Sequence, residues 1–343
     1  MNLTKKFKFT AKKPVLIAEI SANHNGSKKK FFKLINSAFE SGADIVKIQT
    51  YEPQDITINE KKKYLKIKKG LWKNKYLWDL YEEAKTPFSW HKEAFEIARK
   101  RKKIIFSSPF SIRAVDLLEK LNTPIYKISS FEITDFKLIN YIASKMKPII
   151  ISTGMSSLIE IKKAIKLINK FHNKVIIMHC VSKYPTELKD SCLGNILSLK
   201  KMFKNNLIGL SDHTRDIYSS VASIPLGIVA IEKHFRLDEK KKSADYNFSL
   251  TPKMFKDLKK AIVDISYSLQ KKNNNNLSNY NIKFRRSIYA SKDLKKNEII
   301  NDKNIKTLRP NVGISAENYF NILGKVTKKK IKKNSPIYKL DLK

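Results

Sequence analysis

The sequence of 343 residues has little cysteine and no long apolar stretch. Its two cysteines, Cys180 and Cys192, are too few for a disulfide framework or a thiolate zinc site, so we expect ordinary thiols in a reducing compartment. Apolar runs reach only about six to eight residues, far short of the roughly 20 that span a bilayer. The N-terminus has charge but no apolar segment behind it, which argues against a secretory signal and predicts a cytoplasmic protein.

Acidic residues and arginine are also scarce. The chain has 70 Lys and Arg against 31 Asp and Glu, a formal net charge of +39, which is a feature of nucleic-acid-binding proteins. Only 8 of the 70 basic residues are arginine, however, and the lysines are spread along the chain with asparagine-rich stretches such as residues 273–276. We interpret the charge as compositional drift on solvated surfaces, and expect neither a nucleic-acid nor a membrane partner. A field that attracts anionic substrates or polymers is the alternative.

Eight short runs rich in Ile and Val recur before residue 240, and they are continuous rather than alternating. Such runs are typical of strands buried on both faces. They occupy residues 15–20, 45–50, 104–108, 126–129, 148–153, 175–180, 207–211 and 228–232. Stretches of helical periodicity separate most of them, at residues 31–41, 90–100, 114–121, 136–144 and 158–169. Eight βα units in about 240 residues predict an α/β fold of the (β/α)8 TIM-barrel type, with a doubly wound open sheet as the alternative.

The pattern changes after a last helix predicted at residues 252–269. A polar stretch at 271–276 has the composition of a linker. From residue 284 onward, short strand-like pieces such as 287–290 and 335–339 alternate with Lys-Asn and Gly turns. We therefore predict a barrel domain at residues 1–270, a linker at 271–284 and a small β-rich domain at 285–343.

Polar residues follow every predicted strand, at the end where TIM barrels carry their active sites. Lys47 and Lys127 lie inside otherwise apolar strands, where an unpaired charge is costly. They predict a site for a phosphate or carboxylate, completed by serine hydroxyls and backbone amides. The alternative is that each lysine pairs with a barrel carboxylate such as Glu19 or Glu132.

Two histidines close the last two predicted strands. His213 and His234 would be neighbours in a closed barrel, where they can share one divalent ion with substrate oxygens and water. Imidazole ligands favour Mn2+, Zn2+ or Fe2+, and Mg2+ is acceptable where oxygens dominate. The alternative for each is a hydrogen-bonded structural role, while His24 and His179 are candidates for orienting groups.

Several motifs, in this order, resemble those of the sialic acid synthase family. They are AEISANH at residues 18–24, KIQT at 47–50, YKISS at 126–130, STGM at 152–155, YPT at 184–186, GLSDHT at 209–214 and EKHF at 232–235. Residues 286–343, with Leu308, Arg309 and Pro310 in sequence, resemble the antifreeze-like (SAF) domain of these synthases. The resemblance thus extends from about residue 14 to the C-terminus.

Within the family, the closest likeness is to pseudaminic acid synthases. It is carried by the stretch from Gly70 to His91, which includes Trp72, and by DYNFS at residues 245–249. One difference is Ser182, where sialate synthases tend to have asparagine before the YPT motif. The resemblance implies condensation of phosphoenolpyruvate with 2,4-diacetamido-2,4,6-trideoxy-altropyranose and water, with loss of phosphate by C–O cleavage. An N-acetylneuraminate or legionaminate synthase, with another sugar, is the alternative.

The resemblance also implies roles for individual residues. The implied catalytic residues are Glu19, Lys127, His213 and His234, and the two histidines hold a divalent metal ion (Mn2+, Mg2+ or similar). The implied phosphoenolpyruvate contacts are Lys47, Ser108, Lys127, Ser130, Ser152, Ser182 and Ser211. The implied sugar contacts are Gln49, Glu132, Tyr184, Asp245 and Arg309. Arg309 would act on a neighbouring subunit, because the family forms a domain-swapped homodimer.

Three other functions are consistent with parts of the sequence. A synthase of the sugar-acid phosphate type should need extra Arg or Lys for a second phosphate, yet arginine is scarce in this barrel. A polyanion or nucleic-acid binder on a catalytically dead barrel would use the +39 charge itself. A metal-dependent sugar isomerase would not need the two buried lysines.

Overall fold

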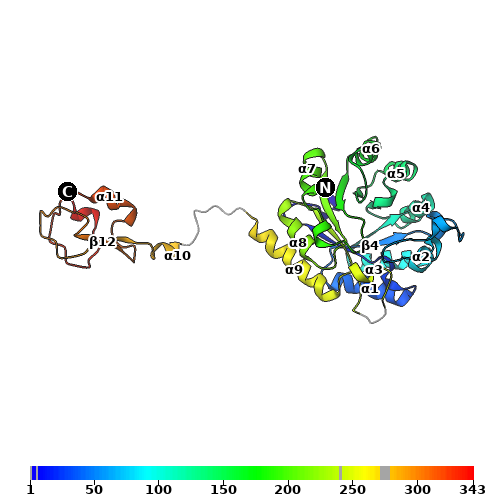
Figure 1. Ribbon diagram of the computed structural model, residues 1–343, viewed down its shortest axis with the longest axis horizontal. Helices are drawn as coiled ribbons and strands as arrows, with labels where there is room; N and C mark the ends of the chain where they lie inside the picture. Colours follow the sequence, from blue (N-terminus) through cyan, green and yellow to red (C-terminus); the bar gives the residue numbers. More distant parts are fainter. Residues whose placement is uncertain (1, 5–6, 239–241, 271–278) are drawn as a thin grey trace. The chain divides into compact units, whose positions relative to one another are not determined.

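The computed structural model describes residues 2–4, 7–238, 242–270 and 279–343 (Figure 1). The chain divides into two compact units, Met1–Gln270 and Lys271–Lys343. Among the described residues, no helix combines the length and the apolar character needed to cross a membrane.

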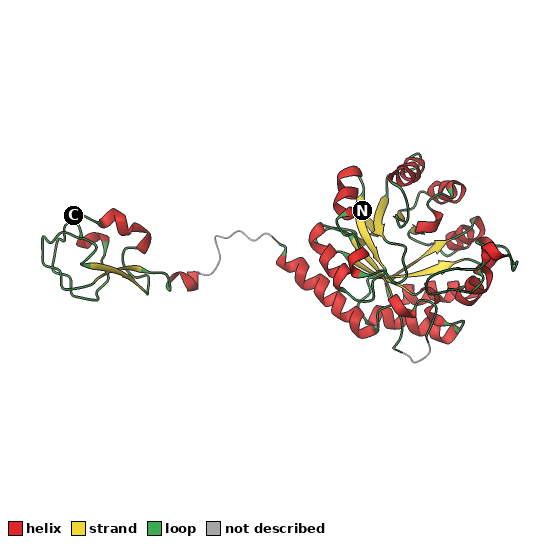
Figure 2. Ribbon diagram, in the orientation of Figure 1, coloured by secondary structure: helices red, strands yellow, loops and turns green. Residues whose placement is uncertain are grey.

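The first unit is built on a closed barrel of eight parallel strands, in the order β10-β3-β4-β5-β6-β7-β8-β9. The strands are β3 (Val15–Glu19), β4 (Ile45–Thr50), β5 (Ile104–Pro109), β6 (Tyr126–Ile128), β7 (Ile149–Ser152), β8 (Val175–Cys180), β9 (Leu207–Asp212) and β10 (Ala230–His234). Figure 2 shows these strands enclosed by helices. The predicted (β/α)8 barrel is confirmed, and the open-sheet alternative is excluded because β10 pairs with β3.

Helices follow the strands along the chain. They are α1 (Lys28–Glu40), α2 (Leu77–Ala84), α3 (Phe88–Lys100), α4 (Ile112–Lys120), α5 (Phe136–Ser144), α6 (Leu158–Ile168), α7 (Asn195–Met202), α8 (Tyr218–Ser223) and α9 (Pro252–Ser268). Local sequence explains several of their starts: Ser157, for example, caps α6 and forms a reciprocal capping box with Glu160. The sequence did not predict α2, α7 and α8, which have 8, 8 and 6 residues and therefore little periodicity to detect.

The barrel interior changes from apolar to polar along the strands. An apolar cluster fills its N-terminal end, and side chains two residues further along a strand point to the same face. At six strands an inward apolar residue is followed in this way by a polar one. The pairs are Ile17 and Glu19, Ile45 and Lys47, Phe106 and Ser108, Ile125 (just before β6) and Lys127, Ile150 and Ser152, and Ala230 and Glu232. The polar layer therefore lies directly on an apolar plug, at the C-terminal ends of the strands.

A second ion pair, outside this polar layer, joins the last two strands. Lys233 is fully buried, lies opposite Asp212 in the pairing of β10 with β9, and its Nζ is 2.9 Å from Asp212 Oδ2. The same Nζ donates to the carbonyl oxygen of Thr214 at 2.6 Å. The pair ties together the two strand ends that carry His213 and His234.

We expect Lys233→Met to destabilise the fold by about 3–5 kcal/mol, because it leaves the Asp212 carboxylate buried without its countercharge. Urea unfolding followed by circular dichroism measures the change. Lys260→Met is the matched control, since it removes a lysine from an exposed helix pair with Asp264 and should leave the free energy of unfolding almost unchanged. Equal losses in the two variants would contradict the prediction.

The second unit has its own small apolar core. Its antiparallel sheet pairs β11 (Ser287–Ala290) with β12 (Ile305–Leu308). The helix α11 (Tyr319–Ile322) contributes Ile322 to the same core. Ile288, Ile300 and Ile337 are almost fully buried within this core. Of the predicted linker 271–284, residues 271–278 lie outside the described part, and α10 (Asn279–Ile282) follows them.

Three details of the predicted elements differ from the structure. The strand predicted at 228–232 lies two residues later, at Ala230–His234, so His234 belongs to the strand itself. The strand predicted at 335–339 is wrong: only an isolated bridge joins Pro336 to Tyr289, and a 3-10 helix begins at Lys339. Proline lacks the amide hydrogen that a continuous ladder needs. The strands β1 (Asn2–Thr4) and β2 (Phe7–Lys8), of three and two residues, were too short to predict.

Candidate active site

A cavity of about 470 Å3 opens at the C-terminal ends of the strands. Its volume lies within the range of roughly 300–1,000 Å3 that small-molecule sites occupy. Eleven of the residues that the sequence assigned to the site line it. They are Lys47, Gln49, Lys127, Ser130, Glu132, Ser152, Tyr184, Ser211, His213, His234 and Asp245. The barrel thus brings together residues that are up to 198 positions apart, Lys47 and Asp245 being the extremes.

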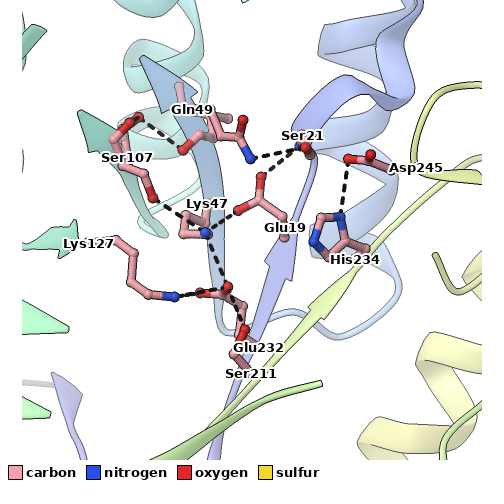
Figure 3. A network of polar contacts seen from close by, with 12 residues as sticks. Glu19, Ser21, Lys47, Gln49, Ser107, Lys127, Ser211, Glu232, His234 and Asp245 are labelled. Atoms are coloured by element: carbon pink, nitrogen blue, oxygen red, sulfur yellow. Dashed lines mark hydrogen bonds and ion pairs between the residues drawn. The ribbon is translucent and has the colours of Figure 1, made fainter. Parts of the chain in front are cut away.

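Two lysines and two glutamates form a buried network at the cavity floor (Figure 3). Lys127 Nζ donates to both carboxylate oxygens of Glu232, at 3.1 and 3.0 Å. Lys47 Nζ lies 3.1 Å from Glu232 Oε1 and 2.6 Å from Glu19 Oε2. Ser211 Oγ donates to Glu232 at 3.2 Å. Both lysines therefore pair with barrel carboxylates, as the alternative interpretation expected. Glu19 is one of the partners it named, whereas the other partner is Glu232 and not Glu132.

Burial and pairing shift the four pKa values in different directions. Burial opposes the ionisation of Glu232, but Lys127 and Lys47 outweigh it and hold the pKa of this carboxyl far below its usual range. Burial also opposes the charge on Lys47, yet Glu19 and Glu232 outweigh it and raise the pKa of this amine. Burial prevails at the other two groups, so the pKa of Glu19 is raised and that of Lys127 is lowered. Both shifts favour the neutral form of the group, and of the two only Lys127 lines the described cavity.

Serine hydroxyls without partners surround the floor. Ser152 Oγ and Ser182 Oγ are enclosed and have no hydrogen-bond partner within the described part of the chain. Ser130 Oγ accepts from the amide of Gly154 at 3.0 Å. A Cβ on Gly154 would lie 2.1 Å from Ser182 Oγ, so only glycine lets these hydroxyls approach the backbone. Buried polar atoms are normally paired, which indicates that this group of hydroxyls is shaped for a ligand.

His213 and His234 face each other on the neighbouring strands β9 and β10, with ring centroids 5.4 Å apart. His213 Nδ1 lies 3.0 Å from the carbonyl oxygen of Val181, an arrangement that protonates Nδ1 and leaves Nε2 free to bind a metal. His234 Nδ1 is 3.4 Å from Asp245 Oδ2. Two imidazoles with oriented rings fit an open divalent site whose remaining ligands are water and substrate oxygens.

The two imidazoles have no third protein ligand beside them in the described part of the chain. Among the described residues, no group of three or more His, Cys, Asp or Glu side chains is placed to hold a metal ion. Aromatic rings surround the pair instead: Tyr184 lies 4.4 Å from His213 and Phe248 lies 4.7 Å from His234, between centroids. These rings limit how much water reaches the histidines.

Glu132 lies at the cavity edge in the 3-10 helix Ser130–Glu132. Its Oε2 is enclosed without a hydrogen-bond partner among the described residues, and burial raises the pKa of Glu132 to about 7. The folded state therefore binds this proton more tightly than the unfolded chain does. The resulting stabilisation is complete below about pH 4.5 and is lost as the pH rises through 7.

We expect Glu132→Gln to stabilise the fold at pH 8 by about 1–3 kcal/mol and to have almost no effect at pH 4.5. The neutral amide does not carry the buried charge that the carboxylate acquires above its pKa. Melting temperatures of both proteins across this pH range measure the difference. A gain of the same size at both pH values would show that ionisation of Glu132 is not its cause.

The remaining candidates, Glu19 and Ser182 included, are not among the residues that line the described cavity. Ser108 is buried in β5 and accepts from Lys47 Nζ at 3.4 Å, so it supports the floor from behind. His24 is buried against Thr86, and His179 bonds the carbonyl oxygen of Ser191 at 2.8 Å, so both are held by neighbours other than the metal pair. Arg309 is exposed in the second unit, just after β12.

Sequence reasoning did not assign Glu232 or Trp72 to the site. Glu232 entered the sequence analysis only as part of the EKHF motif at residues 232–235, and the strand that carries it was predicted two residues too early. Its inward position two residues after Ala230 is the signal that identifies it. Trp72 was named only as part of the stretch that resembles pseudaminic acid synthases. Its place in the cavity depends on how the long loop between β4 and α3 folds.

Comparisons with known proteins agree with this geometry. Residues 34–274 match the NeuB family and residues 285–343 match the SAF domain. The pseudaminic acid synthase of Campylobacter jejuni strain 81-176 is 41% identical over 325 residues, covering 94% of each chain. That of Helicobacter pylori is 40% identical over 94% of this chain and 96% of its own. The N,N'-diacetyllegionaminic acid synthase of Campylobacter jejuni is 37% identical over 95% of this chain and 99% of its own.

Solved structures show the same fold. The N-acetylneuraminic acid synthetase of Leptospira borgpetersenii, in complex with citrate, has a TM-score of 0.71 and 26% identity over 79% of this chain and 90% of its own. The spore coat polysaccharide biosynthesis protein SpsE of Bacillus subtilis has a TM-score of 0.65 and 26% identity over 96% of this chain and 95% of its own.

Proposed function

The chain belongs to the NeuB family and ends in a SAF domain, and from this premise we propose that it is a pseudaminic acid synthase. It condenses phosphoenolpyruvate with 2,4-diacetamido-2,4,6-trideoxy-altropyranose and water, giving pseudaminic acid and phosphate. The observation that carries the proposal is the likeness to pseudaminic acid synthases, at 40–41% identity over 94% of the chain. The buried lysines and unpartnered hydroxyls of the floor support it, because phosphoenolpyruvate is a small polyanion.

Phosphoenolpyruvate binds at the floor. Lys47 and Lys127 contribute positive charge, and the hydroxyls of Ser130, Ser152 and Ser182 contribute hydrogen bonds to the phosphate and carboxylate. The charges of the two lysines are balanced by Glu19 and Glu232 in the structure. The hydroxyls that have no partner are therefore the groups that gain most when the anion arrives.

A divalent ion, Mn2+, Mg2+ or a similar one, would be held by His213 and His234, and when bound it supplies Lewis acidity toward the sugar aldehyde. The carbonyl oxygen of Val181 fixes the ring of His213, while Asp245 approaches that of His234. Tyr184 and Phe248 keep water away from both rings.

The reaction forms one carbon–carbon bond and breaks one carbon–oxygen bond. C3 of phosphoenolpyruvate attacks C1 of the open-chain sugar, water adds at C2, and phosphate leaves with cleavage of its C2–O bond. Glu19 has the raised pKa that suits a group handling the proton of the water or of the sugar hydroxyl. Gln49, Glu132, Tyr184 and Asp245 line the space beyond the floor, where they orient the sugar.

The SAF domain supplies Arg309, whose planar guanidinium suits an amide oxygen or a carboxylate. We place it with the sugar of a neighbouring subunit in a domain-swapped homodimer. Its exposed position, just beyond β12, leaves the side chain available for such a contact.

Phosphate release from phosphoenolpyruvate, measured against a panel of amino sugars with and without EDTA, tests the proposed function. The trideoxy diacetamido sugar should give the highest kcat/KM, and EDTA should abolish release. Turnover with N-acetylmannosamine alone, or with the legionaminate precursor alone, would reassign the substrate. If none of the sugars in the panel supports phosphate release, the interpretation of the protein as an enzyme is overturned.

A further inference from the structure

The wall of the cavity contrasts with its floor. Where the floor is charged, the wall is lined by apolar and aromatic side chains. Eight of these residues come from one continuous stretch of the chain, residues 51–84, between β4 and α3. The members that matter here are Ile56, Ile67, Trp72 and Leu77, all of them half-buried and lining the cavity. A half-buried apolar side chain that faces a cavity has surface left for a ligand to cover.

Backbone and side-chain hydrogen bonds hold this wall in place. Ile67 exchanges hydrogen bonds with the opposite arm of its loop: its amide donates to Lys75 O, and its carbonyl accepts from Asn74 N, both at 2.9 Å. The indole Nε1 of Trp72 donates to Ala244 O at 3.1 Å, although the two residues are 172 positions apart. This bond ties the loop to the segment that carries Asp245, next to His234. The wall is therefore fixed relative to the reacting end of the cavity.

The direction of the sugar follows from where the chemistry occurs. Its aldehyde carbon must face the floor and the two histidines, so the remaining carbons lead away from the strand ends. The ring of Trp72 contacts that of Tyr184 in a tilted arrangement with centroids 5.7 Å apart, and Tyr184 in turn lies 4.4 Å from His213. Trp72 is therefore connected to His213 through the ring of Tyr184. Ile56, Ile67 and Leu77 line the same cavity.

On the basis of the proposed function, we propose that Ile56, Ile67, Trp72 and Leu77 form a specificity wall that selects a 6-deoxy, N-acetylated sugar over its 6-hydroxylated counterpart. The wall packs against the methyl groups that deoxygenation and acetylation place on the sugar. A hydroxyl at the same position would be buried against carbon and would lose its hydrogen bonds to water. Apolar pockets discriminate against one added hydroxyl by up to about 100-fold.

The test compares kcat/KM for the 2,4-diacetamido-2,4,6-trideoxy sugar with kcat/KM for the same sugar bearing a 6-hydroxyl, by phosphate release. The wild-type ratio should be about 10–100 in favour of the deoxy sugar. Ile67→Thr and Ile56→Thr each place a hydroxyl in the wall and should narrow the ratio by at least about threefold. Ile67→Val and Ile56→Val, which match threonine in shape but add no hydroxyl, should keep it within about twofold.

Two further measurements separate the wall from the floor and from general damage. The KM for phosphoenolpyruvate should stay unchanged in the threonine variants, because that substrate binds to the floor. Ile58→Thr is the positional control: Ile58 is 49% exposed on the same loop and is not among the residues lining the described cavity, so the variant should behave as the wild type.

The outcomes distinguish this inference from the proposed function. A wild-type enzyme that does not turn over the trideoxy sugar overturns the proposed function. A wild-type enzyme that uses both sugars equally well leaves the proposed function standing and overturns the specificity wall. The wall is also overturned if neither threonine variant changes the ratio, or if the valine variants change it as much.

Discussion

Replacing Lys127 by methionine should lower kcat/KM for phosphoenolpyruvate on the order of 100–1,000-fold while the barrel remains folded. The variant removes one of the two cations of the floor and leaves the anionic substrate facing Glu232. Much of the loss should appear as a higher KM for phosphoenolpyruvate, because the lysine binds charge that is already present in the ground state. The fold tolerates the change because Glu232 keeps Lys47 at 3.1 Å and Ser211 at 3.2 Å.

Lys47→Met provides the comparison that separates binding from stability. Lys47 pairs with both Glu19 and Glu232, so its removal leaves Glu19, whose Oε2 lies 2.6 Å from the amine, without a countercharge. Urea unfolding should therefore show a larger loss of stability for Lys47→Met than for Lys127→Met, although both lose activity. An active Lys127→Met enzyme with an unchanged KM would contradict the assignment of phosphoenolpyruvate to the floor.

Replacing His234 by glutamine should lower both the bound metal per chain and the rate of phosphate release, the latter by at least about 100-fold. The amide fills similar space but is a poor ligand for a divalent ion, and His213 alone provides only one nitrogen. Metal content after dialysis, measured by mass spectrometry, is the readout that does not depend on activity.

His179→Gln is the matched control for this variant. His179 also lies near the end of a barrel strand, one residue before the end of β8, yet its Nε2 bonds Ser191 O, so the change should leave metal content as it is in the wild type. EDTA should remove the metal from the wild-type enzyme, and added Mn2+ should restore activity. A His234→Gln protein that retains its full metal content would show that the ion is held elsewhere.

The barrel and much of the site were predictable because they depend on local patterns. Continuous apolar runs mark strands that are buried on both faces, and Lys47 and Lys127 are conspicuous inside such runs. The histidines were placed together because β9 and β10 must be neighbours in a closed barrel. Each of these inferences needs only the strand positions and the parallel topology of the fold.

The rest depends on distances that the sequence does not contain. Glu232 pairs with Lys127 across 105 residues, and nothing local to either residue distinguishes this partner from Glu132. The placement of Trp72 depends on a hydrogen bond to Ala244, which only the folded loop creates. Of the strand predicted at 335–339, only Ile337 belongs to the small core, and pairing is limited to an isolated bridge between Pro336 and Tyr289.

The floor and the wall of the cavity differ in how their residues are distributed along the sequence. The floor is assembled from single residues scattered over the strands, so no single segment of the chain carries it. Much of the wall comes from one segment, residues 51–84, between β4 and α3. The segment that contacts the sugar can therefore change during evolution while the residues that form the carbon–carbon bond are kept. Exchanging residues 51–84 between synthases is a direct way to exchange their sugar specificity.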